Sequence, residues 1–176
     1  MKNYSKEDME EGLDCYCPET RVFPKIAKAE GPQKLRKQDV LLILKWILGR
    51  IKESNCKTVS DDNLRQINQS VEKSGETARE IEALKELDKI PGIGLATATA
   101  ILTVCYPDMF TILDYRVLET LDLEPSNTDS WTAEQYFEEY LPRVKEQCGQ
   151  WDCTLRQADR ALWGLSVRDQ IKNITG

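Results

Sequence analysis

The sequence predicts an all-α fold of about seven to nine helices. Apolar residues recur three and four positions apart along most of the chain, as on the buried face of a helix. Gly and Pro stand where several of these patterns stop, and no segment shows the strict alternation of a β-strand. The chain also has no low-complexity tract and no long-period repeat.

The length of 176 residues is enough for one domain with a hydrophobic core, with room for a division into two small lobes. We expect residues 1–20, which are polar and acidic, to form an irregular arm, and residues 21–176 to form a single helical domain. Hydrophobic residues make up 40% of the chain and charged residues 31%, as in a globular protein. No apolar run reaches the length of a membrane span, and the start lacks an apolar signal core. We therefore expect no membrane association and a cytoplasmic location, or a nuclear one in a eukaryote.

The first two helices of the domain are predicted from periodicity and capping. The first covers residues 37–53, where the apolar residues are spaced for one helical face. These residues are Val40, Leu41, Leu44, Ile47, Leu48 and Ile51. The second begins after Ser60, a good N-cap followed by two aspartates in the first turn, and it ends before Gly75.

Two further helices, over residues 76–88 and 95–105, flank the segment Ile90-Pro91-Gly92-Ile93-Gly94. A Gly-Ile-Gly turn leaves backbone N–H groups free at the start of the second helix, where the helix dipole is also positive. These groups form a site for one phosphate, and the glycines allow both the tight turn and a close approach of the phosphate. The predicted ligands to a DNA backbone are the groups of Gly92, Ile93, Gly94, Ala96 and Thr97.

Three helices are predicted in the C-terminal part of the chain. Asp114 opens a short one over residues 115–121, since Asp is among the best N-caps. Ser130 or Thr132 starts a long one that ends at Gly149, and the last follows from about residue 155.

Asp114 follows Gly94 by twenty residues, at the end of the run Phe110-Thr111-Ile112-Leu113-Asp114. Together with the Pro-Gly-Ile-Gly turn, this segment resembles the helix-hairpin-helix DNA glycosylase superfamily, in which a catalytic aspartate follows the hairpin at this spacing. It is most similar to the endonuclease III-like enzymes and, from hairpin to aspartate, to the monofunctional adenine glycosylases. The resemblance covers about residues 84–121, a fifth of the chain, and implies a helix-hairpin-helix glycosylase-like bundle.

The resemblance implies that Asp114 is the catalytic residue. Cleavage of an N-glycosidic bond builds positive charge on the sugar, which a fixed carboxylate stabilises; the carboxylate can also orient or deprotonate a water molecule. The alternative, that Asp114 only caps a helix, is compatible with this role. Bifunctional relatives carry a nucleophilic lysine where this chain has Ala96. The resemblance therefore implies a monofunctional enzyme that releases the base without cutting the strand, or a protein without catalysis.

Side chains near these residues supply further candidates. Tyr115 and Arg116 follow the aspartate and, with Trp46, are candidates for a pocket around an extruded base, although an aromatic residue on a helix is more often part of the core. Lys45 and Arg50 are candidates for phosphate contacts. Some adenine-specific relatives place a catalytic carboxylate near the position of Lys45, so the acid that would protonate a leaving purine is missing here.

The formal net charge of −6 argues against nucleic acid, but the charges are unevenly distributed. Residues 21–52 contain nine Lys or Arg and two acidic residues, a net +7, whereas residues 105–152 contain three Lys or Arg and eleven acidic residues, a net −8. Such a molecule can present a basic face to a phosphate backbone. The alternative is that these are ordinary solvated helix faces.

The chain has no histidine, which excludes a Ser-His-Asp triad and leaves carboxylates, Lys, Tyr or Cys for acid–base chemistry. Its six cysteines are expected to be free thiols. Cys15, Cys17, Cys148 and Cys153 could together bind a metal, but their spacing fits neither the usual zinc pattern nor the iron–sulfur pattern of many endonuclease III-like enzymes. We therefore expect no metal and no organic cofactor.

The sequence thus favours a monofunctional base-excision repair glycosylase, acting as a monomer on double-stranded DNA with the damaged or mismatched base flipped out. A non-catalytic helix-hairpin-helix DNA-binding protein is the first alternative, favoured by the negative net charge and the missing carboxylate. A helical protein-interaction domain, in which the Gly-Ile-Gly turn serves only helix packing, is the second.

Overall fold

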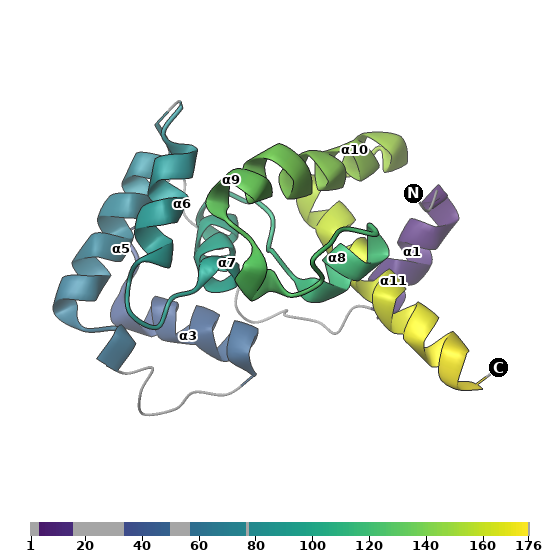
Figure 1. Ribbon diagram of the computed structural model, residues 1–176, viewed down its shortest axis with the longest axis horizontal. Coiled ribbons are helices and arrows are strands. Elements are labelled where there is room, and N and C mark those ends of the chain that lie inside the picture. The colour runs from purple at the N-terminus through teal and green to yellow at the C-terminus, as the bar shows by residue number, and fades with distance from the viewer. Residues whose placement is uncertain (1–3, 16–33, 50–56, 77, 176) are drawn as a thin grey trace. The chain divides into compact units, whose positions relative to one another are not determined.

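Figure 1 shows the computed structural model of the chain, which describes residues 4–15, 34–49, 57–76 and 78–175. These residues contain eight α-helices of six or more residues and no β-strand, so the predicted all-α fold is confirmed for the described part of the chain. No helix in that part is both long enough and apolar enough to cross a membrane.

The described residues form two compact units. The first, called here the hairpin unit, lies between residues 34 and 107. The second, called the aspartate unit, combines residues 4–15 with residues 108–175. Residues 4–15 are therefore not a separate arm, because they belong to the same unit as the C-terminal helices.

The hairpin unit contains α3 (Lys37–Leu48), α5 (Asp61–Ser74), α6 (Glu80–Asp88) and α7 (Leu95–Cys105). α7 is its central helix, since it packs against α3, α5 and α6 and its side chains are buried almost throughout. Burial of this apolar helix stabilises the unit through the hydrophobic effect.

The predicted limits of α5 and α7 are confirmed. The Ser60 hydroxyl accepts a hydrogen bond from the backbone N–H of Asn63 at 3.3 Å, so Ser60 is the N-cap of α5. α5 ends at Ser74, directly before Gly75, and α7 runs from Leu95 to Cys105 as expected.

The predicted limits of the other two helices need correction. α3 ends at Leu48 rather than Glu53, because Gly49 adopts a left-handed conformation (φ 69°) that stops the helix; residues 50–53 lie outside the described residues. α6 begins at Glu80 rather than Glu76. Ala78 has φ 66°, and this left-handed residue breaks the helical pattern before α6.

The aspartate unit contains α1 (Lys6–Cys15), α8 (Tyr115–Thr120), the short helices η1 (Thr128–Ser130) and α9 (Ala133–Gln135), the π-helical turn η2 (Tyr136–Tyr140), α10 (Leu141–Trp151) and α11 (Leu155–Thr175). α11 is the longest helix and packs against α1, α8 and α10. The core of this unit therefore forms around α11.

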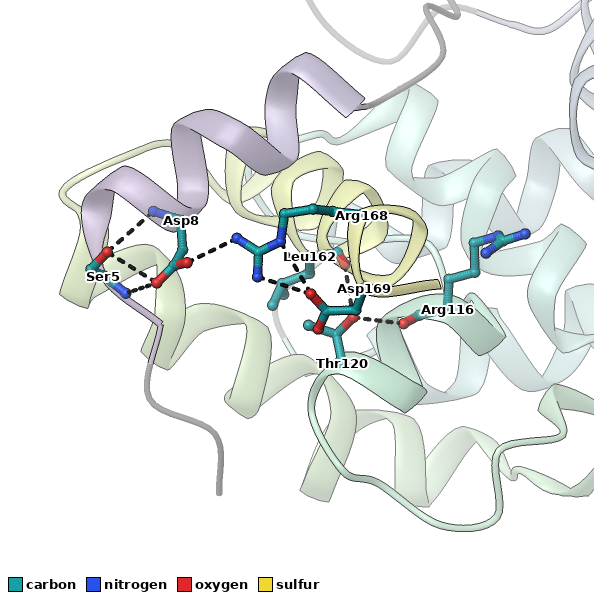
Figure 2. Close-up of polar contacts among 7 residues, drawn as sticks. All are labelled: Ser5, Asp8, Arg116, Thr120, Leu162, Arg168 and Asp169. Atoms are coloured by element: carbon teal, nitrogen blue, oxygen red, sulfur yellow. Dashed lines mark hydrogen bonds and ion pairs between the residues drawn. The ribbon is translucent and has the colours of Figure 1, made fainter. Parts of the chain in front are cut away.

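The predicted irregular arm is wrong for residues 6–15, which form α1. Ser5 and Asp8 cap its start reciprocally, with the Ser5 N–H bonded to Asp8 at 2.8 Å and the Asp8 N–H bonded to Ser5 at 3.2 Å (Figure 2). α1 crosses α11 closely, since a Cβ on Gly164 would lie 1.6 Å from the carbonyl oxygen of Gly12. The prediction failed because two glycines, rather than an apolar stripe, allow this packing.

The predicted end of the long C-terminal helix is also wrong. Thr132 is the N-cap, as one of the two predictions had it, but α10 continues through Gly149 to Trp151. Asp152 then stops the helix with φ 52°. The reason is tertiary, because Trp151 is buried and its indole N–H donates to the carbonyl oxygen of Tyr4 at 3.0 Å.

Candidate functional site

The turn between α6 and α7 is held by two isoleucines. Ile90 and Ile93 are buried, whereas Pro91, Gly92 and Gly94 between and beside them are exposed. The N–H of Ile93 donates to the carbonyl oxygen of Ile90 at 2.9 Å and closes the turn. The apolar anchors therefore fix the turn from inside and leave its glycine backbone at the surface.

The two glycines of the turn have different roles. Gly92 has φ 83°, and a Cβ there would lie 2.2 Å from Oγ1 of the buried Thr58. Gly94 has φ −93° and ψ 174°, which any residue can adopt, and a Cβ there would meet nothing within 4 Å. Gly92 is thus required by the fold, whereas the protein itself leaves Gly94 open to substitution.

The amino end of α7 presents backbone groups rather than side chains. Gly94 is its N-cap, and within the described residues no side chain caps this end. The first-turn N–H groups, from Leu95 to Thr97, have no partner inside the helix by its geometry. Ala96 is half-buried, and the side chain of Thr97 is buried. Contacts at Ala96 and Thr97 would therefore use backbone N–H groups, and Ile93 has already committed its own N–H to the turn.

The run that leads into Asp114 is held by two tyrosines of η2. The Tyr136 hydroxyl accepts from the N–H of Thr111 at 3.0 Å and donates to the carbonyl oxygen of the same residue at 2.7 Å. The Tyr140 hydroxyl donates to the carbonyl oxygen of Ile112 and accepts from the N–H of Asp114 at 3.4 Å. Because both tyrosines are fully buried, this backbone segment is rigidly placed in the core.

Asp114 is the N-cap of α8, as predicted. Its Oδ1 accepts the backbone N–H of Arg116 at 2.8 Å, and the side chain of Trp163 on α11 also hydrogen-bonds to it. Burial raises the pKa of Asp114 above its usual value. Glu119 adds to this rise, whereas the Arg116 N–H, the Arg116 charge and the Trp163 hydrogen bond lower the pKa. The net result is a desolvated carboxylate held in a fixed orientation, which is suited to stabilising a nearby positive charge.

Arg116 lies between two aromatic rings. Its guanidinium carbon is 5.1 Å from the centre of the Tyr115 ring and 5.2 Å from the centre of the Trp163 ring. Its Nη1 also donates to Oε1 of Gln170 at 2.9 Å. Tyr115 is 45% exposed, so its ring is the accessible aromatic surface next to Asp114.

The remaining candidates are distributed over the two units. Lys45 is exposed and Trp46 is half-buried, and both lie on α3 of the hairpin unit. Tyr115 and Arg116 lie on α8 of the aspartate unit. Arg50 lies outside the described residues, as does half of the basic segment 21–52.

The structure identifies three residues near Asp114 that sequence reasoning did not connect with it, namely Tyr136, Tyr140 and Trp163. The two tyrosines are four residues apart, which places them on one helix face and is a signal that sequence analysis could have used. Trp163 lies 49 residues beyond Asp114, and no local pattern links the two positions.

Cys148 and Cys153 are the two candidate metal ligands whose side chains the structure describes. Cys148 donates its thiol hydrogen to the carbonyl oxygen of Cys153 at 2.6 Å, and burial raises the pKa of Cys153 to about 11. Cys17 lies outside the described residues, as does the side chain of Cys15. In the part of the chain that is described, no three Cys, Asp or Glu side chains are grouped so that they could hold a metal ion.

We compared the chain with known proteins. No protein-family model, no curated protein and no solved structure matches it.

Proposed function

We propose that this protein is a monofunctional DNA glycosylase of the helix-hairpin-helix type, which hydrolyses the bond between a damaged or mismatched base and its sugar. The observation that carries the proposal is the state of Asp114, a desolvated carboxylate held by a backbone amide and an indole at the start of a helix. A group of this kind is suited to an oxocarbenium-like transition state, in which the sugar carries positive charge.

The hairpin supports the DNA part of the proposal. The turn exposes Gly94 at the start of α7, and no side chain of the described residues accepts the first N–H groups of the helix, so these groups and the positive end of the helix dipole are available to one phosphate. A Cβ at Gly94 would meet nothing within 4 Å among the described residues, so the packing of the protein does not explain why this residue is a glycine, whereas the close approach of a phosphate would. A phosphate at this position would hold the duplex in register while the target nucleotide leaves the stack.

In the proposed reaction, Asp114 stabilises the sugar cation as the base leaves and orients or deprotonates the attacking water. The protein would leave an abasic site and an intact strand, because Ala96 stands where bifunctional relatives carry the lysine nucleophile and offers no amine for a Schiff base. The accessible Tyr115 ring is a candidate surface for stacking of the extruded base.

A non-catalytic DNA-binding protein is the second candidate function. It is favoured by the hydrogen bond from the Arg116 N–H to Asp114, because this bond alone gives Asp114 a purpose as a helix cap. A sequence pI of about 4.9 also favours it over an enzyme that must hold DNA tightly.

The deciding experiment measures base release from duplexes that carry uracil, oxidised guanine, alkylated purines or mismatched adenine. Products are treated with and without alkali, for the native protein, Asp114→Asn and the control Asp108→Asn, which changes an exposed aspartate of the same unit. We expect strand breaks only after alkali, and a loss of about 100-fold or more in Asp114→Asn alone. Asn is as good an N-cap as Asp, so the variant should fold.

The outcomes separate the candidate functions. Release that is equal in Asp114→Asn and the native protein would refute the role of Asp114. No release from any substrate, with DNA affinity that falls steeply as salt rises, would favour the binding protein. Absence of salt-dependent DNA binding would refute both DNA-related functions and favour the helical protein-interaction domain.

A further inference from the structure

We infer that Trp163 is the positioning residue for Asp114. Its indole N–H holds the carboxylate in place at the start of α8, and its ring packs against the guanidinium of Arg116. The kinetic part of this inference rests on the proposed function, whereas the effect on the carboxylate itself does not. The indole has a single polar hydrogen and no acceptor, so its bond to Asp114 can only be a donation to the carboxylate.

The place of Trp163 is set by contacts on both sides of it along α11. The hydroxyl of Thr120 on α8 lies within hydrogen-bond distance of two carbonyl oxygens, that of Leu162 on α11 at 2.9 Å and that of Arg116 on its own helix at 3.0 Å, and it shares its single hydrogen between them (Figure 2). One turn further on, the hydroxyl of Ser166 donates to Glu119 at 3.0 Å. These two contacts tie α8 to α11 at the residue before Trp163 and at the third residue after it. The indole therefore meets α8 in one register only.

Trp163 acts on Asp114 by two routes. The direct route is the hydrogen bond from its indole N–H to the carboxylate. The indirect route is the packing of its ring against the guanidinium of Arg116 at 5.2 Å, which keeps that positive charge beside the aspartate. Both contacts favour the ionised form, and they oppose the desolvation that raises the pKa of Asp114.

Arg116 does not replace the indole as a side-chain donor. Its Nη1 is bonded to Gln170 at 2.9 Å, and its planar group lies over the two aromatic rings. What it donates to Asp114 is its backbone N–H. Removal of the indole N–H should therefore leave the carboxylate with the backbone amide and change both its orientation and its proton affinity.

The test is Trp163→Phe, which keeps an aromatic ring for Arg116 but removes the N–H. Trp151→Phe is the matched control, since it removes an indole N–H that donates to the backbone of Tyr4 in the same unit. The titration of Asp114 is followed in each free protein by the carbon resonance of its carboxyl group. We expect its midpoint to move upward in Trp163→Phe and to stay unchanged in Trp151→Phe. An unchanged midpoint in Trp163→Phe overturns the inference.

A measurement on the native protein covers the case in which Trp163→Phe does not fold. The indole N–H resonance of Trp163 should shift with pH at the midpoint of Asp114, and this shift should vanish in Asp114→Asn. A Trp163 resonance that does not follow Asp114 overturns the inference, whichever variants fold.

The proposed function is tested separately from this inference. If the native protein releases a base, the acidic limb of its pH profile should move to higher pH in Trp163→Phe, because the ionised carboxylate is the active form. If it releases none, the glycosylase proposal fails, while the titration still decides whether Trp163 controls Asp114.

Discussion

The hairpin unit and the aspartate unit hold their candidate residues in different ways. In the hairpin unit, the turn is fixed by buried isoleucines and by one left-handed glycine, and its exposed groups belong to the backbone. In the aspartate unit, Asp114 is fixed by side chains, with Tyr140 bonded to its N–H and Trp163 bonded to its carboxylate. The first arrangement depends on shape, and the second depends on hydrogen bonds.

This difference determines how each region can be tested. Substitutions that change the backbone or add a Cβ probe the hairpin, because no side chain of its exposed turn carries a charge. Substitutions that keep the shape and remove a polar atom probe the aspartate unit, because its buried hydroxyls and carboxylate make specific bonds.

The largest effect is expected for Gly92→Ala in the hairpin. A non-glycine residue at φ 83° is strained, and the new Cβ would lie 2.2 Å from Oγ1 of Thr58. We expect the free energy of unfolding to fall by about 3 kcal/mol, as measured by urea denaturation. The double variant Gly92→Ala with Thr58→Ala should recover the part of the lost free energy of unfolding that comes from the clash, but not the part that comes from the strained φ. A loss below about 1 kcal/mol in Gly92→Ala would contradict the importance of shape here.

Tyr136→Phe is expected to be the next largest effect, in the aspartate unit. It leaves both the N–H and the carbonyl oxygen of Thr111 buried without their partner, so we expect a loss of about 2 kcal/mol. Tyr106→Phe is the matched change in the hairpin unit, where the Tyr106 hydroxyl donates to the carbonyl oxygen of Val71 at 3.0 Å from a half-buried position. A smaller loss is expected there because water can reach the site. Equal losses of stability in the two variants would contradict the difference between the two units.

Gly94→Ala should affect DNA binding and leave the fold intact. The new methyl group meets nothing within 4 Å and the backbone angles suit alanine, so the stability should stay the same or rise by up to about 1 kcal/mol. If a phosphate binds at this turn, the affinity for duplex DNA should fall about fivefold, and the dependence of log affinity on log salt should become shallower. Unchanged affinity would show that the turn is not the contact with DNA.

The smallest effect is expected in the pH dependence of stability. Because the folded-state pKa of Asp114 is raised, the folded protein keeps this proton to a higher pH than the unfolded chain. The stability of the native protein relative to Asp114→Asn should therefore fall as pH rises from the usual aspartate pKa through the raised value. Urea denaturation of both proteins over that pH range measures the difference between their free energies of unfolding.

A carboxylate with the opposite shift supplies the control for that experiment. The hydrogen bond from Arg168 is the largest cause that lowers the pKa of Asp8 (Figure 2). The stability that this ion pair contributes should be lost as pH falls through the lowered pKa. The stability of the native protein relative to Asp8→Asn should therefore rise with pH, whereas its stability relative to Asp114→Asn should fall. The same direction for both variants would contradict the assignment for Asp114.

Local features of the fold were predictable from the sequence. The Ser60 cap, the limits of α7 and the position of Asp114 before α8 all agree with the structure, because a cap and a run of apolar residues act within a few positions of the chain. The all-helical class follows from the same local signals. The role of the hairpin and of Asp114 in DNA repair remains a prediction from resemblance.

Other features depended on residues far apart in the chain. α1 forms against α11 through Gly12 and Gly164, and α10 extends past Gly149 because Trp151 is buried beside Tyr4. No periodic pattern indicates these contacts, since a glycine shows only the absence of a side chain until its neighbour is known.

The sequence by itself thus determined most of the helices, the caps at Ser60, Asp114 and Thr132, and the two places where chemistry is expected. Only the tertiary structure decided the surroundings of Asp114, where Trp163 supplies a hydrogen bond and the packing of the core removes water. Helix formation depends on neighbours three and four residues apart, whereas the proton affinity of a carboxylate depends on every group around it in space.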